Sequence, residues 1–409
     1  MKCPLTNYKS TEDVHWAFHL PIKQIFTPMK TLILSLALIV SGSIFAAEKI
    51  NDPQLLIEDD SFKGSIQVAI LLDTSSSMDG LINQAKSRLW NIVNTLTTLR
   101  YDGKVPAIEI ALYEYGNSGL SIESDYIRQV AGLTTDLDLI SEQLFALHTY
   151  GGSEYCGAVI KDATKKLDWN SDKNAMKLIY IAGNEPFNQQ GSINYKEAIA
   201  DAQKKGIFIN TIFCGNKEEG IRTFWKDGAD LGKGNYFNID YNAQIRYIVT
   251  PYDDQISRCN LQLNQTYIGY GSLGRSKKEA QAVQDSNAQE ISSANMAERA
   301  VAKAGVAYSN SSWDLVDRYA DDKNVINALK KEELPKELQG KSKEEIKKYI
   351  ENKTTERNQL QKEIAELAKQ RQAFIDKEQQ KEGVQDDLGN AINTSVSQFA
   401  KLKGYTVKK

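Results

Sequence analysis

Short apolar runs and amphipathic segments alternate along the chain from residue 66 to about residue 240. The run IQVAILL at 66–72 is apolar except for Gln67, which is typical of a strand buried on both faces of a parallel sheet. Further strands are predicted at 107–116, 126–134, 176–186 and 207–216, and helices at 82–96, 138–147, 157–167 and 194–206. This alternation predicts an α/β fold with a doubly wound, mostly parallel sheet.

Beyond Pro251 the strand pattern stops and helical patterns take over. We expect a helical region over 251–335, a long helix or coiled coil over 340–381, and a C-terminal tail over 382–409 with one short helix and a loose end. Apolar side chains of the long helix fall at heptad core positions, but Lys353, Arg357 and Arg371 fill others. Charged core positions weaken a coiled coil, so a hairpin against neighbouring helices, self-association through this helix and a long rod all stay open.

The N-terminal residues carry a targeting pattern. Residues 29–47 contain a Met and a Lys, an apolar stretch from Leu32 to Val40, and small residues before Glu48, as secretory signal peptides do. The apolar stretch is too short for a stable membrane span, so we expect export to the periplasm or cell surface after its removal. Residues 1–28 resemble neither a signal nor a fold, and we interpret them as an upstream, non-native extension.

Composition narrows the classes of partner. The chain has 409 residues, 25% of them charged, and a formal net charge of −3. This mild acidity gives no electrostatic reason to expect nucleic acid as a partner.

The first predicted strand ends in an unusual polar cluster, DTSSS at 73–77. In doubly wound sheets, ligands bind outside the carboxyl ends of the strands, where the strand order reverses. Asp73, Ser75 and Ser77 alternate along the chain, so their side-chain oxygens can converge in that crevice. The sequence therefore predicts an oxygen-rich ligand site at this end of the sheet.

The motif Asp73-Thr74-Ser75-Ser76-Ser77 resembles the D-x-S-x-S signature of the von Willebrand factor A family, and the resemblance extends over residues 62–250. It implies a metal-ion-dependent adhesion site that holds a divalent cation, Mg²⁺ or Mn²⁺, with Asp73, Ser75 and Ser77 as ligands. It also implies a partner protein whose carboxylate completes the coordination of the cation.

Two further loops depart from the family pattern. The sequence GGSEYCG at 151–157 has Glu154 where the family usually has a metal-binding Thr, and AGNEP at 182–186 has Gly183 where the family usually has an Asp. Because a hard divalent cation needs oxygen ligands and compensating charge, we predict that Glu154 replaces the lost Asp as the fourth ligand. The alternative is a degenerate site that binds metal weakly or not at all.

Catalytic groups are scarce once residues 1–47 are set aside. His148 is then the only histidine, eight residues before Cys156, and a lone His of this kind is more often a packing or surface residue. We therefore expect no enzymatic activity. Cys156 and Cys214 either form a disulfide or remain separate buried thiols. The sequence favours a metal-dependent, adhesion-type protein-binding module of the bacterial cell envelope, and the alternative is a structural scaffold with a degenerate metal site.

Overall fold

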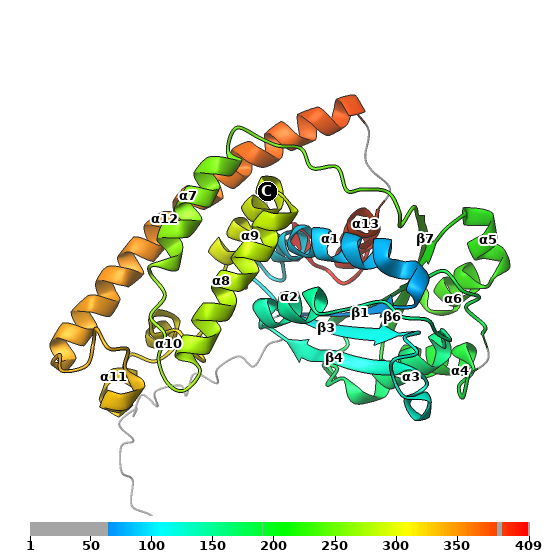
Figure 1. Cartoon of the computed structure of the whole chain (residues 1–409), viewed down its shortest axis with the longest axis horizontal. Coiled ribbons are helices and arrows are strands. Elements are labelled where there is room, and N and C mark those ends of the chain that lie inside the picture. The colour runs from blue at the N-terminus through cyan, green and yellow to red at the C-terminus, as the bar shows by residue number, and fades with distance from the viewer. Residues whose placement is uncertain (1–63, 190, 383–386, 408–409) are drawn as a thin grey trace, which may run out of the picture. The chain divides into compact units, whose positions relative to one another are not determined.

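The computed structural model describes residues 64–189, 191–382 and 387–407. The predicted extension and signal peptide, residues 1–47, lie outside the described residues. Strands and helices alternate as far as β7, and further helices follow (Figure 1). Within the described ranges, every helix is too short or too polar to cross a membrane.

The strands are β1 (Ser65–Asp73), β2 (Leu99–Arg100), β3 (Ala107–Tyr115), β4 (Ile127–Thr134), β5 (Met176–Gly183), β6 (Ile207–Cys214), β7 (Lys233–Ile239) and β8 (Thr406–Val407). The helices of the first part are α1 (Asp79–Thr97), α2 (Leu137–Phe145), α3 (Cys156–Lys166), α4 (Tyr195–Lys204), α5 (Lys217–Arg222) and α6 (Trp225–Leu231). The later helices are α7 (Asp253–Asn264), α8 (Gly274–Ile291), α9 (Ser293–Ala304), α10 (Leu315–Asp321), α11 (Val325–Ala328), α12 (Lys343–Glu382) and α13 (Leu388–Leu402).

Six strands form one sheet in the order β4-β3-β1-β5-β6-β7. All neighbouring strands are parallel except β3 and β4, so the segment at 126–134 is an antiparallel edge strand. From β1 the chain builds outward to β3 and β4 and then returns to add β5 on the other side. This confirms the predicted doubly wound sheet and places its switch point between β1 and β5.

Helices cover both faces of this sheet (Figure 1). Val68 and Leu72 of β1 belong to the core beneath α1, α2 and α13, whereas Ala69 and Leu71 belong to the core beneath α3, α4 and α6. β1 is buried along its whole length because side chains on both faces meet a helical layer.

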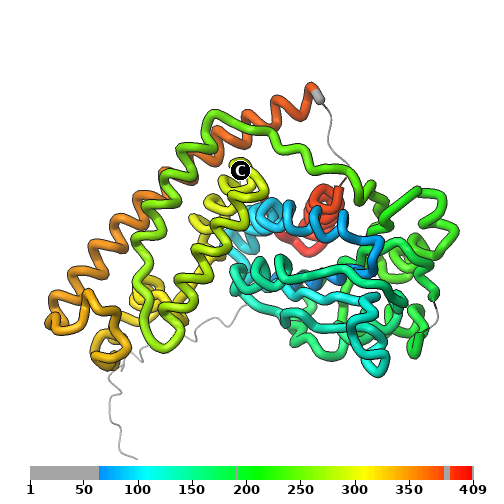
Figure 2. Tube along the Cα trace, viewed as in Figure 1, coloured from blue at the N-terminus to red at the C-terminus, as the bar shows by residue number. Residues whose placement is uncertain are grey.

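The last helix, α13, completes one of these layers. Figure 2 shows it in red beside the blue α1, and its buried Ile392 and Val396 share a core with β5 and β6. The ring of Phe399 lies 4.5 Å from that of Phe208 on β6. Asp387 caps α13 and also pairs with Arg88 of α1. The helix α13, beyond residue 386, thus packs on the sheet domain, and α7–α12 form an insertion between β7 and α13.

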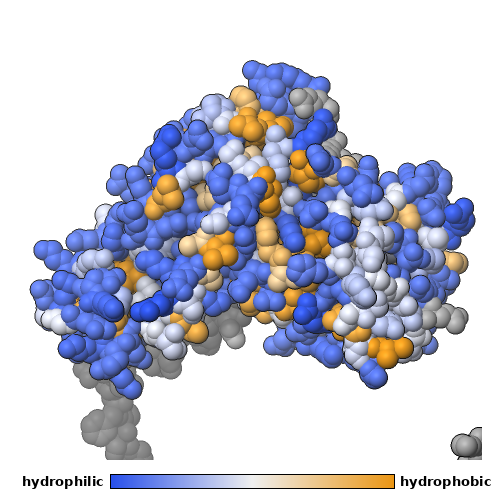
Figure 3. All heavy atoms as spheres, viewed as in Figure 1, coloured by the Kyte–Doolittle hydropathy of each residue, from blue (hydrophilic) through white to orange (hydrophobic). Residues whose placement is uncertain are grey.

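The long helix α12 packs on α7, α9 and α10 of the same chain. The arginines at its heptad core positions are buried there in ion pairs, Arg357 with Asp314 at 2.7 Å and Arg371 with Asp253 at 2.8 Å. The apolar heptad residues Ile346, Ile350, Leu360, Ile364 and Leu367 are buried as well. On the face shown in Figure 3, the surface over α12 is mostly hydrophilic. The sequence left three arrangements of this helix open. In the structure, α12 packs against neighbouring helices of the same chain.

Candidate metal site

The carboxyl ends of β1, β3 and β5 meet at the switch point of the sheet. Asp73 is the last residue of β1, Tyr115 ends β3 directly beside it, and Gly183 ends β5 on its other side. The chain leaves β1 through the hydroxyl cluster at 74–77 and a short 3₁₀ turn before α1 begins. The predicted ligands of the DTSSS motif therefore lie where this fold places ligands.

Asp73 is fully buried and only half satisfied. Its Oδ1 accepts a hydrogen bond from the backbone N–H of Ser75 at 2.8 Å, whereas Oδ2 has no hydrogen-bond partner among the described residues. Burial raises the pKa of Asp73 to about 7, although the hydrogen bonds from Ser75 oppose that shift. Burying a carboxylate oxygen without a partner costs free energy of folding. A proton or a cation bound to Oδ2 would remove this cost.

The two predicted serine ligands lie beside each other. The hydroxyl oxygens of Ser75 and Ser77 are 3.4 Å apart, and the side-chain amide of Asn184 donates to Ser77 at 3.2 Å. The other end of that amide, Oδ1 of Asn184, is a second buried acceptor without a partner in the described part of the chain. The structure thus brings a further oxygen to the site from the loop that follows β5.

Two glycines bring Glu154 to Asp73. A Cβ atom on Gly152, which has a φ of +145°, would lie 1.4 Å from the carbonyl oxygen of Gly116, so only glycine allows this approach of the two backbones. A Cβ on Gly116 would in turn lie 2.8 Å from Cγ of Glu154 and 2.9 Å from Oδ1 of Asp73. The two acidic side chains therefore converge over Gly116, as required of a shared ligand site.

Hydrogen bonds hold the loop of Glu154 against the DTSSS motif. The backbone N–H of Tyr150 donates to the carbonyl of Thr74 at 3.0 Å, and that of Gly151 donates to the hydroxyl of Ser76 at 2.5 Å. These two hydrogen bonds join the loops and hold the segment of Glu154 next to the DTSSS motif.

Position 183, where the family pattern has an aspartate, has no room for a side chain, and sequence reasoning did not identify this. A Cβ on Gly183 would lie only 2.5 Å from the hydroxyl of Tyr115 and 3.0 Å from Oδ2 of Asp73. The Tyr115 hydroxyl, which donates to the carbonyl of Ala182 at 3.0 Å, fills the space that a side chain at position 183 would need. The spacing of residues does not indicate this contact, because it depends on the pairing of Tyr115 with Asp73 between β3 and β1.

The site is electrostatically acidic. Burial, followed by the nearby carboxylates of Asp73 and Glu185, raises the pKa of Glu154 to about 7. Glu185 itself is exposed at the rim. Clustered carboxyl groups with raised pKa values repel one another when ionised, and a cation between them removes that repulsion.

These residues fit a hard divalent cation. Carboxylate, hydroxyl and amide oxygens are the donors that such ions prefer, and Oδ2 of Asp73 is an acceptor that lacks a partner. No group of three or more His, Cys, Asp or Glu side chains in the described ranges is arranged to hold a metal, so the hydroxyls of Ser75 and Ser77 would have to contribute. Asp73, Ser75, Ser77 and Glu154 all lie together as candidate ligands.

The cysteines near the site are buried, unbridged thiols. Cys156, Cys214 and Cys259 form no disulfide within the described residues. Sγ of Cys156 lies 4.0 Å from the hydroxyl of Tyr115, and burial raises the pKa of this thiol well above its ordinary value. A thiol that stays protonated is a poor nucleophile, so Cys156 acts as packing beneath the site.

One protein-family model matches the part of the chain that holds this site. Residues 67–250 match the family model of the von Willebrand factor type A domain. All four candidate ligands fall inside this match, and α13 lies outside it. Among the curated proteins compared with this chain, none matches it.

Solved structures show similarity over part of the chain. Proximal thread matrix protein 1 from the mussel byssus is 13% identical, with a TM-score of 0.31, and the match covers 44% of this chain and 42% of that one. A second structure of that protein, with a zinc-occupied MIDAS motif, is 14% identical, with a TM-score of 0.32 and coverage of 44% and 43%. The SpRpn10 VWA domain is 15% identical, with a TM-score of 0.30 and coverage of 43% of this chain and 88% of that one.

Proposed function

We propose that the VWA domain of this protein is a metal-dependent protein-binding module, and that Asp73, Ser75, Ser77 and Glu154 hold a divalent cation, Mg²⁺ or Mn²⁺. The observation that carries the proposal is the unpartnered, buried Oδ2 of Asp73 beside a second carboxylate with a raised pKa. An acidic cluster of this kind is stabilised by a cation, and its oxygen donors suit a hard one.

The proposed partner is a protein that offers a carboxylate. A cation in this site would accept a carboxylate oxygen from the partner. Ser76, Ser77 and Glu185 are exposed, so the site opens to solvent beyond the buried Asp73. Tyr150 and Ile122, at 65% and 64% exposed, belong to the loops on the same side of the sheet and provide apolar surface next to it. The proposed setting is the bacterial cell envelope, on the basis of the signal-peptide pattern at 29–47.

Calorimetric titration of Mg²⁺ and Mn²⁺ into the protein tests the proposal. The wild type should bind one cation, and Asp73→Asn should lose binding because it removes the charge at the buried end of the site. Asp168→Asn is the matched control, since Asp168 is exposed and its backbone carbonyl accepts from Gln67 near the amino end of β1. Absence of binding to the wild type, or equal binding to Asp73→Asn, would refute the metal site.

A structural scaffold with a silent site is the second candidate function. It is favoured by the Tyr115 hydroxyl, which takes the space of the family's third-loop ligand, and by the buried ion pair of Arg299 with Asp138, which joins the inserted helices to the sheet domain. The same titration separates the two candidates. A folded wild type that binds neither cation supports the scaffold.

A further inference from the structure

A small pocket lies on the insertion, between α11 and the start of α12. Its volume is about 250 Å³, and it is lined by four aliphatic side chains, three lysines and Gly340. All of these residues fall within the segment 326–346, so the pocket is separate from the candidate metal site at the carboxyl ends of the strands.

The aliphatic side chains form an apolar wall of this pocket. Ile326 and Ile346 are almost fully buried in a hydrophobic cluster of the insertion, and Leu329 and Leu334 pack against that cluster. Leu329 and Leu334 are only half-buried, so they provide most of the apolar surface that a ligand can reach. The apolar part of a ligand would extend the cluster, and its burial would contribute to binding.

Every charged side chain that lines the pocket is a lysine. Lys331, Lys341 and Lys343 are exposed, and none of them forms an ion pair with a described residue. The ammonium of Lys343 donates to Oδ1 of Asn327 at 3.2 Å, and this neutral amide does not compensate its charge. Three positive charges beside an apolar wall are complementary to an anionic group that carries an apolar chain.

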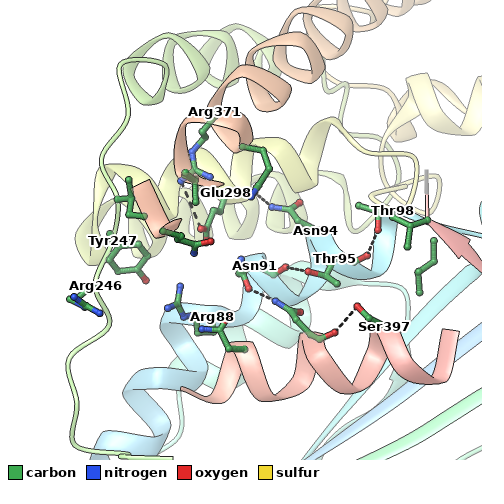
Figure 4. A pocket seen from close by; sticks show the side chains of 18 residues that line it. Arg88, Asn91, Asn94, Thr95, Thr98, Arg246, Tyr247, Glu298, Arg371 and Ser397 are labelled. Carbon is green, nitrogen blue, oxygen red and sulfur yellow. Dashed lines mark hydrogen bonds and ion pairs between the residues drawn. The ribbon is translucent and has the colours of Figure 1, made fainter. Parts of the chain in front are cut away.

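The larger cavity between α1, α9, α12 and α13 differs in this respect. Of its three arginines, Arg88 and Arg371 are paired with buried aspartates, and Figure 4 shows Arg371 beside Glu298. The third, Arg246, has a partner as well. The charged groups of that cavity are engaged within the chain, whereas the three lysines of the small pocket can pair with a ligand.

Acidic residues near the pocket argue against a membrane surface as the occupant. Five glutamates of the segment 330–348 do not line the pocket: Glu332, Glu333, Glu337, Glu344 and Glu345. Hydrogen bonds from Ser342, and after them the charge of Lys341, hold the pKa of Glu345 below its ordinary value. A broad anionic surface would meet these carboxylates together with the lysines, whereas a single anionic group can be placed in the pocket itself.

The volume of the pocket indicates a short ligand. A volume of about 250 Å³ is below the range of about 300–1,000 Å³ that is usual for the sites of drug-sized molecules. A medium-chain fatty acid has one carboxylate and one short alkyl chain, which match the lysines and the apolar wall.

We propose that this pocket binds a free medium-chain fatty acid, with its carboxylate among the three lysines and its alkyl chain against Leu329 and Leu334. This site is independent of the proposed metal-dependent function.

Calorimetric titration of octanoate and decanoate into the protein tests this proposal. We expect saturable binding of at least one of them, and binding at least about fivefold weaker of acetate, which lacks the chain, and of 1-octanol, which lacks the charge. The double variant Lys331→Gln, Lys341→Gln should bind the fatty acid about fivefold more weakly or worse, because two of the three positive charges are lost.

A second double variant, Lys336→Gln, Lys348→Gln, is the matched control. It makes the same change of net charge at exposed positions that do not line the pocket, so it should bind as the wild type does. All four lysines are exposed, so we expect both double variants to fold.

A fivefold loss in Lys331→Gln, Lys341→Gln, with unchanged binding in the control, supports the site. Lack of saturation with both fatty acids up to about 10 mM overturns it, and so does equal binding by the two double variants. Sedimentation of the protein with phosphatidylglycerol vesicles, without binding of either free fatty acid, would overturn it in favour of a membrane surface.

Discussion

The hydroxyl of Tyr115 lies so close to the α-carbon of Gly183 that a Cβ on Gly183 would be 2.5 Å from it. A tyrosine at position 115 therefore requires a glycine at position 183. Gly183→Ala should destabilise the protein by about 1–3 kcal/mol through overpacking. Tyr115→Phe removes the clashing oxygen, so the cost of Gly183→Ala should fall by about 1 kcal/mol or more in that background. Urea unfolding of the four proteins of this double-mutant cycle, in EDTA, measures the coupling. Additive effects would show that Tyr115 does not set the residue at position 183.

Glu154→Gln should weaken the binding of Mn²⁺ about tenfold or more, because it removes one of the two carboxylates that converge over Gly116. Glu197→Gln, at an exposed position of α4, is the matched control and should leave the affinity unchanged. Calorimetric titration of both variants checks the prediction. Equal affinities for wild type and Glu154→Gln would mean that the cation, if bound, is held without Glu154.

Phe399→Ala on α13 should cost about 3–5 kcal/mol of stability, because this buried ring packs on Phe208 of the sheet. Leu402→Ala on the same helix should change the stability by less than about 0.5 kcal/mol, since Leu402 is 66% exposed. Denaturant unfolding of both variants makes the comparison. Similar small effects would mean that α13 does not belong to the core of the sheet domain.

Asp138→Ala should destabilise the protein by about 3–5 kcal/mol, because it leaves the charge of Arg299 buried and partly unpaired. Arg299 is fully buried, 2.7 Å from Asp138 of α2, and its guanidinium lies 4.6 Å from the ring of Trp90 on α1. Asp230→Ala breaks the exposed pair with Lys226 and should cost less than about 1 kcal/mol. The difference between the two unfolding free energies is the readout, and equal costs would contradict a buried link between the sheet domain and the insertion.

Asp285 should make stability depend on pH in the acid range. Burial alone would raise the pKa of Asp285, but the ammonium of Lys303 and the guanidinium of Arg299 hold it well below its ordinary value. Between the two pKa values the unfolded chain binds more protons than the folded one, so this contribution is full above the ordinary pKa and is lost as pH falls toward the folded value. Urea unfolding from about pH 7 to about pH 3 should show the advantage of wild type over Asp285→Asn shrinking. A constant difference would contradict the pairing.

Some of this architecture could be read from residue patterns, and some depended on contacts that patterns do not contain. The run at 66–72 followed by DTSSS predicted a central strand and a site at its carboxyl end, because burial on both faces and a polar stop are local properties. A short helix in the C-terminal tail was also predicted, but the sequence pattern does not say which surface it packs on. The heptad positions of Arg357 and Arg371 indicated a weak coiled coil, whereas their partners Asp314 and Asp253 lie 43 and 118 residues away along the chain.

The candidate metal site also has one part that the sequence predicts and another that depends on contacts between distant residues. The convergence of Asp73, Ser75 and Ser77 follows from their alternation at the end of one strand. The approach of Glu154 depends on Gly116 and Gly152, which allow two loops to touch, and the role of Tyr115 depends on its register beside Asp73. Neither relation has a signature in the spacing of residues.

The insertion of α7–α12 between β7 and α13 bears on the order in which the chain folds. The core under α1 contains Leu388, Ile392 and Phe399 as well as residues of β1, so this core cannot close until the segment at 388–402 has left the ribosome. Until then α13 does not cover its face of β5 and β6. The inserted helices α7–α12 precede α13 in the chain and are synthesised before it. Contacts over such sequence separations form slowly, so we expect the docking of α13 on β5 and β6 to be a late step of folding.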